Sequence, residues 1–287
     1  MSMLLQTTIN GIVIGSAFSL VALGLTMIWG IMHISNFAHG SFYMIGGYVI
    51  WTIITLLGVD FWLAILITAV VMAIFGAIVE RLTFRPAEGP FSTPLSSLIV
   101  SIGLIMIFNN SVLAIWGARP ETLGAINIQE FHFLNVTVTL QRVLIVVAAV
   151  ILIALLQFFL KRTTLGMSIE ATAQNEESAR LMGINTSRVG SIVFAMGVSL
   201  AAIAAGLMAP LTNINIGMGD HMTTYGFVII ILGGMGSIPG AIIGGFILGL
   251  ISSLSATYLT ANYYEVIVFG VLILILAIKP TGLFGAK

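Results

Sequence analysis

Charged residues are scarce in this sequence. Only 7% of its 287 residues are charged, 59% are hydrophobic, and the mean hydropathy is +1.15. Soluble domains carry about 25% charged residues, so this chain has too few to cover a water-exposed surface. We therefore expect an integral membrane protein whose main solvent is lipid.

Signatures of catalysis are absent as well. The sequence has no cysteine, which excludes disulfides and thiolate metal sites. It has no G-x-x-x-x-G-K-[ST] phosphate loop, no G-x-S-x-G elbow, and no histidine pair with a carboxylate at metal-ligand spacing. The net charge of zero gives no indication of nucleic acid. We therefore expect no enzyme, and no cofactor, metal or nucleic acid bound to this chain.

Long apolar stretches make up most of the chain. A helix needs about 20 apolar residues to cross the hydrocarbon core of a membrane. The candidate spans are residues 8–29, 40–57, 61–80, 94–117, 140–160, 190–210, 223–237, 239–258 and 263–279. Span 40–57 begins in a polar patch, and span 223–237 is short and ends in glycines. We therefore expect one all-α, polytopic domain over residues 1–287, with eight or nine crossings and some broken or short segments.

The basic residues indicate how the spans are oriented. The first is Arg81, which favours a retained first helix over a secretory signal. When residues 161–190 are placed in the cytoplasm, eight basic residues lie inside and two outside. The inside set is Arg81, Arg85, Lys161, Arg162, Arg180, Arg188, Lys279 and Lys287, and the outside set is Arg119 and Arg142. The positive-inside rule therefore predicts a cytoplasmic C-terminus.

The segment 118–139 joins two spans on the predicted outer side. It contains the short alternating stretches "INIQ" and "NVTVTL". Alternation with a period of two predicts a small external hairpin, and an ordinary connecting loop fits the pattern equally well.

One polar segment, residues 161–190, interrupts the apolar sequence and holds 7 of the 20 charges. Within it, Asn175 is a good N-cap, because its side-chain oxygen accepts a free backbone N–H. Glu176 and Glu177 follow in the first turn, where the helix dipole favours negative charge. Gly183 is a natural stop, since glycine adopts a positive φ without steric cost. The pattern predicts a helix of two turns.

The predicted short helix carries apolar residues. Leu181 and Met182 lie on it, and Ile184 lies just beyond. A helix of two turns is not stable alone, so it needs a surface to pack on. Apolar anchors on a capped short helix suit docking into a groove of another protein, and packing on its own bundle is the alternative. Asn185 or Ser187 is expected to cap the next membrane helix.

Polar residues also occur near the inner end of an early span, at His33, Asn36 and His39. Polar side chains at membrane depth are costly and usually face the bundle interior or a water-filled path. On one helix, Asn36 and His39 would share a face, because they are three residues apart. We predict that Asn36, His39 and the adjacent Gly40 line a substrate path. The alternative is a cluster that satisfies backbone groups at a helix end.

Glycine is concentrated late in the chain. The stretch 233–249 contains seven glycines, at positions 233, 234, 236, 240, 244, 245 and 249. Gly236, Gly240 and Gly244 recur every four residues, which predicts a bare stripe for close helix approach. Gly11, Gly15 and Ser19 in the first span show the same spacing.

The glycine-rich stretch also interrupts a helix. Pro239 and the pair Gly233–Gly234 precede the stripe. Interrupted helices in transporters are typical of the substrate path. We therefore predict that Gly233, Gly234, Gly236 and Pro239 belong to this path, with plain helix packing as the alternative.

Charged residues near span ends have simpler interpretations. Glu80, Arg81 and Arg85 lie at the inner end of the third span, where we expect them to anchor the topology. Asp220 and His221 are expected in a solvated outer loop, with gating of the outer mouth as the alternative. Because no lysine or arginine lies in mid-span, we expect no fixed cation for a substrate carboxylate in the path.

Several motifs resemble those of permease subunits of ABC importers. "ESARLMG", with Glu177, Ala179 and Gly183, is similar to the E-A-A-x-x-x-G coupling loop, with Ser178 in place of the second alanine. "NFAHGSFYMIGGY", "LGGMGSIPGAIIGG" and "KPTGLFG" are similar to segments of branched-chain amino acid importer permeases, the shorter of two permease types. The resemblance extends from "GLTMIWGIMHISNFAHG" to the C-terminus.

The resemblance implies a function and partners. It implies a cytoplasmic coupling helix in which Glu177, Ala179, Leu181, Met182, Gly183 and Ile184 contact an ATPase. The family works in the bacterial inner membrane with a second, related but different permease, two cytoplasmic ATPase subunits that hold ATP and Mg, and an external binding protein. Branched-chain or other hydrophobic amino acids are the expected substrates, with urea or short-chain amides as alternatives. A passive small-solute channel is the competing function, since broken glycine-rich helices and paired histidines fit it too.

Overall fold

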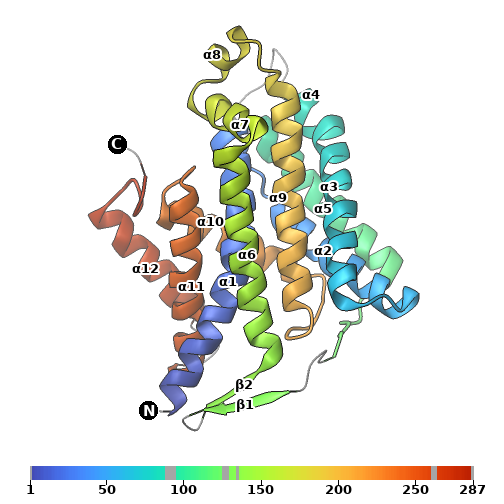
Figure 1. Cartoon of the computed structure of the whole chain (residues 1–287), viewed down its shortest axis with the longest axis vertical. Helices are drawn as coiled ribbons and strands as arrows, with labels where there is room; N and C mark the ends of the chain where they lie inside the picture. The colour runs from blue at the N-terminus through green and yellow to red at the C-terminus, as the bar shows by residue number, and fades with distance from the viewer. Residues whose placement is uncertain (1, 88–94, 125–128, 134–135, 260–263, 286–287) are drawn as a thin grey trace.

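The computed structural model describes residues 2–87, 95–124, 129–133, 136–259 and 264–285. These residues form a bundle of long helices with the short helix α8 at one end and a two-stranded hairpin at the other (Figure 1). We call these the α8 end and the hairpin end. The N-terminus lies at the hairpin end.

The elements follow one another along the chain as a succession of helices interrupted once by the hairpin. They are α1 (Ser2–Met32), α2 (His39–Leu57), α3 (Phe61–Val79), the π-helical turn η1 (Glu80–Phe84), α4 (Arg85–Ala87), α5 (Ser96–Trp116), β1 (Glu130–Phe133), β2 (Val136–Thr139), α6 (Leu140–Arg162), α7 (Thr164–Gln174), α8 (Glu176–Leu181), α9 (Thr186–Met208), α10 (Met218–Gly233), α11 (Ile238–Tyr258) and α12 (Tyr264–Ile278).

Seven helices in the described part of the chain are long and apolar enough to cross a membrane. They are α1, α2, α3 with its extension through α4, α5, α6, α9 and α11. Helices α10 and α12 are shorter, with 16 and 15 residues. The polytopic helical class is thus confirmed, and the count of eight or nine crossings stays a prediction that depends on these two helices.

Helix α10 begins earlier than the sequence predicted. It starts at Met218, so Asp220 and His221 lie in its first turn rather than in a loop before it. His221 Nδ1 lies 3.5 Å from Glu265 Oε1 of α12, and both side chains are largely exposed. The expectation of a solvated loop at these two residues is therefore wrong in its secondary structure.

The predicted hairpin is present, and its external location stays a prediction. Strands β1 and β2 are antiparallel, with Glu130 paired to Thr139 and Phe133 paired to Val136. Residues 126–128 of "INIQ" and residues 134–135 lie outside the described residues. Strand β2 continues directly into α6, so the hairpin is fixed at the end of this helix.

Helix α1 crosses the centre of the bundle and packs closely on α11. In the most apolar 18-residue stretch of α1, 89% is buried inside the structure, so the other helices cover α1 on nearly all sides. A Cβ at Gly15 would lie 2.9 Å from Phe246 Cα, and Ser19 Oγ donates to Ile242 O at 2.9 Å. Small residues at four-residue spacing allow this approach of two backbones. The predicted stripe on the first span is confirmed.

The facing stripe on α11 differs from the predicted one. Gly245 and Gly249 face α1, where added Cβ atoms would meet Ser19 and Gly15. Gly244 instead faces α10, since its Cβ would lie 3.0 Å from Ile229 O. Gly236 precedes the helix and has φ +82°, so it cannot belong to a helical stripe.

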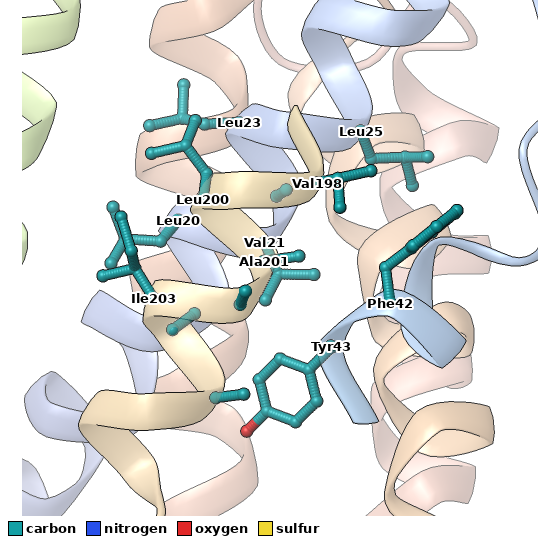
Figure 2. Packing of buried hydrophobic residues seen from close by; sticks show 14 of the residues in the cluster. Leu20, Val21, Leu23, Leu25, Phe42, Tyr43, Val198, Leu200, Ala201 and Ile203 are labelled. Carbon is teal, nitrogen blue, oxygen red and sulfur yellow. The ribbon is translucent and has the colours of Figure 1, made fainter. Parts of the chain in front are cut away.

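A central part of the hydrophobic core lies between α1, α2 and α9. Figure 2 shows Leu20, Val21, Leu23 and Leu25 of α1 beside Val198, Leu200, Ala201 and Ile203 of α9, with Phe42 and Tyr43 of α2 in the same cluster. Phe42 also packs edge-to-face against Phe108 and Phe194, with ring centroids 5.2 and 5.8 Å away. This core holds the start of α2 in a fixed place inside the bundle.

Candidate translocation and coupling sites

The chain leaves α1 and returns into the bundle before α2 begins. His33 follows α1 with φ +53°, residues 33–38 are not helical, and His39 Nε2 lies 3.1 Å from Val21 O. Val21 lies about three turns, or about 16 Å, before the end of α1. The segment therefore runs back alongside α1. Irregular backbone at membrane depth is tolerated only where protein buries it or where it lines a water-filled cavity.

Two buried polar side chains lie on this returning segment. Asn36 is 0% exposed and His39 is 1% exposed. Within the described structure, Asn36 Oδ1 and Nδ2 and His39 Nδ1 have no hydrogen-bond partner. Unsatisfied buried groups of this kind cost about 1–3 kcal/mol each, so most buried polar groups have a partner, and Asn36 and His39 are exceptions among the described residues.

The predicted relation between these two residues needs correction. They do not share a helix face, because Asn36 precedes α2 and only His39 belongs to it. They are nevertheless close along one returning segment, with His39 N bonded to Asn36 O at 3.3 Å. Their place on a substrate path remains a prediction.

Gly40 brings α2 against the start of α10. Its backbone N donates to Thr223 Oγ1 at 3.2 Å, and the same oxygen lies 3.1 Å from Gly219 O. A Cβ at Gly219 would lie 2.9 Å from Gly40 O. The N-terminal turns of α2 and α10 thus meet through the backbones of Gly40 and Gly219. This contact follows Asn36 and His39 directly in the chain. Gly219 was not predicted as part of this contact, because the predicted span began at residue 223.

The remaining predicted path residues lie at the opposite end of α10. Gly233 is about 21 Å from Gly219 along the helix. Leu283 N and Phe284 N donate to Leu232 O and Gly233 O at 2.8 and 2.9 Å. The "KPTGLFG" segment therefore packs on the end of α10, and Gly234, with φ +101°, turns the chain there.

The turn after α10 leads directly into α11. Gly236 has φ +82° and packs near Gly30 of α1. Ser237 caps α11 by accepting from Gly240 N at 3.2 Å, and Pro239 lies in the first turn. Proline is well suited to a first turn, where its missing N–H has no helical partner. Gly233, Gly234, Gly236 and Pro239 thus form a compact turn that is separate from Asn36, His39 and Gly40.

The short polar helix has the predicted boundaries and caps. Helix α8 covers Glu176–Leu181, and Asn175 Oδ1 accepts from Ser178 N at 2.8 Å. Gly183 has φ +86°, which stops the helix as predicted. Asn185 caps α9 by accepting from Arg188 N at 3.0 Å.

The predicted coupling residues divide into two groups. Glu177, Leu181, Met182 and Gly183 are exposed, with Leu181 84% and Met182 85% accessible. Ala179 is only 5% exposed, and the half-buried Ile184 packs against the bundle core. Helix α8 stands beyond the ends of the long helices (Figure 1). The large apolar side chains of Leu181 and Met182, at its C-terminal end, are exposed.

A buried polar cluster lies next to α8 and was not predicted. Glu80 is 2% exposed, and Arg85 Nε lies 3.2 Å from its Oε1. Ser191 Oγ of α9 donates to Glu80 Oε2 at 2.6 Å. Glu80 and Arg85 line a cavity of about 400 Å³ together with Glu176 and Arg180 of α8. From the sequence we predicted only that Glu80 and Arg85 anchor the topology, because the residues around them give no sign of a contact with Ser191 on α9.

Long apolar helices, a polar segment that returns between them and an exposed short helix at one end define a polytopic membrane protein. A family described as "Branched-chain amino acid transport system / permease component" matches residues 7–277. The chain belongs to this family of transport permeases, whose members are not catalytic enzymes.

Individual relatives agree with the family. The chain is 36% identical to "High-affinity branched-chain amino acid transport system permease protein LivH" of Escherichia coli, covering 98% of this chain and 95% of the relative. It is 35% identical to the corresponding permease BraD of Pseudomonas aeruginosa, with the same coverage. It is also 27% identical to "Fructose import permease protein FruF" of Bifidobacterium longum, over 68% of this chain and 55% of the relative. No solved structure matches the chain.

Proposed function

We propose that this chain is the permease subunit of a binding-protein-dependent ABC importer that carries branched-chain or other hydrophobic amino acids across the bacterial inner membrane. The family and the names of the relatives that cover nearly the whole chain support this substrate class. The sequence has no phosphate loop, so ATP and Mg belong to two separate ATPase subunits. A second, related permease and an external binding protein complete the importer.

The observation that carries this proposal is the exposure of Leu181 and Met182 on α8. Large apolar side chains are costly to leave in water, and burial of one contributes about 1.5–3 kcal/mol. Caps on both sides of α8 fix its length, so these side chains form a defined knob for a groove on the ATPase.

The distribution of basic residues supports an orientation. Arg81, Arg85, Arg180 and Arg188 lie at the α8 end, whereas Arg142 lies in the first turn of α6, next to the hairpin. By the positive-inside rule, the α8 end faces the cytoplasm and the hairpin faces outside. The nine helices α1, α2, α3, α5, α6, α9, α10, α11 and α12 then alternate in direction, which leaves the C-terminus in the cytoplasm.

The test is recovery of the ATPase subunit with the tagged chain in mild detergent. Leu181→Asp should lower recovery at least about tenfold, because a charged side chain replaces the buried anchor. Gln174→Asp, an exposed change on the adjacent α7, is the matched control and should leave recovery unchanged. Full recovery with Leu181→Asp and Met182→Asp together means that α8 does not dock the ATPase.

A further inference from the structure

A second cavity lies between helices toward the hairpin end. Its volume is about 490 Å³, and its lining comes from α1, α6, α10, α11 and the end of α9. This volume falls in the range of about 300–1,000 Å³ that is typical of small-molecule sites. Val13, Ile14, Phe18 and Met208 form an apolar part of the wall.

One cation lines this cavity. Arg142 Nη1 donates to Asn10 Oδ1 of α1 at 2.7 Å, which fixes the guanidinium against the cavity wall. Among the residues that the structure describes, no carboxylate lines this cavity and no ion pair includes Arg142. A guanidinium has five N–H donors and pairs best with a carboxylate through two of them. The sequence predicted no fixed cation for a substrate carboxylate because none lies in mid-span, and Arg142 lines this cavity from the first turn of α6.

A buried hydroxyl lines the same cavity. Ser252 of α11 is 9% exposed, and its Oγ has no hydrogen-bond partner in the part of the chain that the structure describes. Buried hydroxyls are almost always hydrogen-bonded, so the Ser252 hydroxyl is available to a polar group of a solute in this cavity. Unlike Ser252, the neighbouring Ser253 is satisfied, because its Oγ donates to Thr7 O at 2.7 Å.

We propose that this cavity binds a small solute with one carboxylate and an apolar side chain. Arg142 holds the carboxylate, Asn10 positions Arg142, and Ser252 offers its oxygen to the solute's ammonium group. Val13, Ile14, Phe18 and Met208 surround the apolar side chain. The proposal rests on the proposed function and narrows its substrates, because urea, short amides and neutral sugars lack the group that Arg142 binds.

The experiment uses the assembled importer in vesicles of phosphatidylcholine. A single Ala256→Cys is introduced in the cysteine-free chain, since Ala256 is exposed and lines the cavity. L-leucine should slow its alkylation by a thiol reagent, whereas isovaleramide, which has a similar side chain and no carboxylate, should not.

A pair of arginine variants identifies the group that binds the carboxylate. Arg142→Gln should raise the half-protecting leucine concentration at least about tenfold, because a charge-assisted bidentate contact is lost. Arg119→Gln removes an exposed arginine that does not line the cavity, so protection should be unchanged. If Arg142→Gln lowers the amount of protein, Ser252→Leu, which fills the cavity, must abolish protection instead.

Three results overturn the proposal. The first two are equal protection of the cysteine at position 256 by isovaleramide and unchanged protection by leucine in Arg142→Gln. The third is protection by added phosphatidylglycerol in the absence of leucine, which would assign the cavity to a lipid headgroup. ATP-driven uptake in the same vesicles separates this proposal from the proposed function. Normal uptake without protection by leucine refutes only the proposal that this cavity binds the solute. Protection without ATP-driven uptake refutes only the proposal that the protein is part of an ATP-driven importer.

Discussion

Ser191 and Glu80 are 111 residues apart in the chain, yet Ser191 Oγ donates a hydrogen bond of 2.6 Å to Glu80 Oε2. Arg85 completes the cluster, because its Nη2 donates to Ser187 O at 2.9 Å and to Ser191 Oγ at 2.5 Å. The three side chains join the end of α3 to the start of α9. Since Thr186 of α9 also bonds to Arg180 of α8 at 3.2 Å, the base of the exposed helix is tied to the bundle.

Ser191→Ala should destabilise the protein by about 1–3 kcal/mol, because it removes a donor from a buried carboxylate. The thermal midpoint of the purified protein in detergent measures this loss. Ser178→Ala, at an exposed serine of α8, is the control and should leave the midpoint unchanged. Equal midpoints for the wild type and Ser191→Ala contradict a structural role for the cluster.

Asn36→Leu should separate stability from transport. Because both polar atoms of Asn36 are buried without partners, an apolar replacement should keep or raise the thermal midpoint. Leucine uptake by reconstituted vesicles should fall if Asn36 belongs to the path. The matched control is Thr68→Val, which removes an unpartnered buried hydroxyl from α3 and should leave uptake unchanged. Normal uptake in Asn36→Leu removes this residue from the path.

Gly183→Val should weaken ATPase association without lowering the amount of protein in the membrane. A Cβ at Gly183 meets nothing within 4 Å, so the cost is purely conformational. A non-glycine residue at its φ of +86° costs about 1–2 kcal/mol. Gly183→Asn should weaken association less, because asparagine tolerates the left-handed region. Equal association in the two variants argues against this explanation.

Gly249→Ala should lower the thermal midpoint, because its added Cβ meets the backbone of Gly15. Overpacking of this kind costs about 1–3 kcal/mol. Gly103→Ala is the matched control within α5, where a Cβ has no atom within 4 Å and alanine favours the helix. The midpoint of Gly103→Ala should equal or exceed that of the wild type. A tolerated Gly249→Ala shows that α1 and α11 can separate without cost.

The orientation is tested with single cysteines at Thr122 and Ser178, both of which are exposed. A membrane-impermeant thiol reagent added to intact cells should label position 122 and leave position 178 unlabelled. Permeabilised cells serve as the control, since both positions should then react. The reverse pattern in intact cells excludes a cytoplasmic α8 and its contact with an ATPase.

The sequence predicted the features that depend on neighbouring residues. Asn175 and Gly183 fix α8 because a cap or a positive φ acts within one turn, and the spacing of Gly11, Gly15 and Ser19 marks a close-packed face. Apolar length alone identified the seven long spans. The separate helix α7 was not distinguished within the polar segment, although Thr163 caps it by accepting from Gly166 N at 2.9 Å.

Features that depend on distant residues were not predictable in the same way. Periodicity placed Asn36 and His39 on one helix face, whereas tertiary packing ends α1 at Met32 and returns the chain into the bundle. Ser191 and Glu80 carry no local sign of their contact. The Arg142 cavity needs five segments to come together, and no single stretch of sequence records it.

The packing of α1 on α11 also constrains the order of events in synthesis. Gly15 leaves the ribosome roughly 230 residues before Gly249, its contact on α11. At about 5–20 residues per second, this interval lasts on the order of ten to fifty seconds. During that time the small-residue face of α1 has no partner, so lipid or the insertion machinery must occupy it until α11 displaces them. Helix α1 is thus made long before α11, on which its small-residue face finally packs.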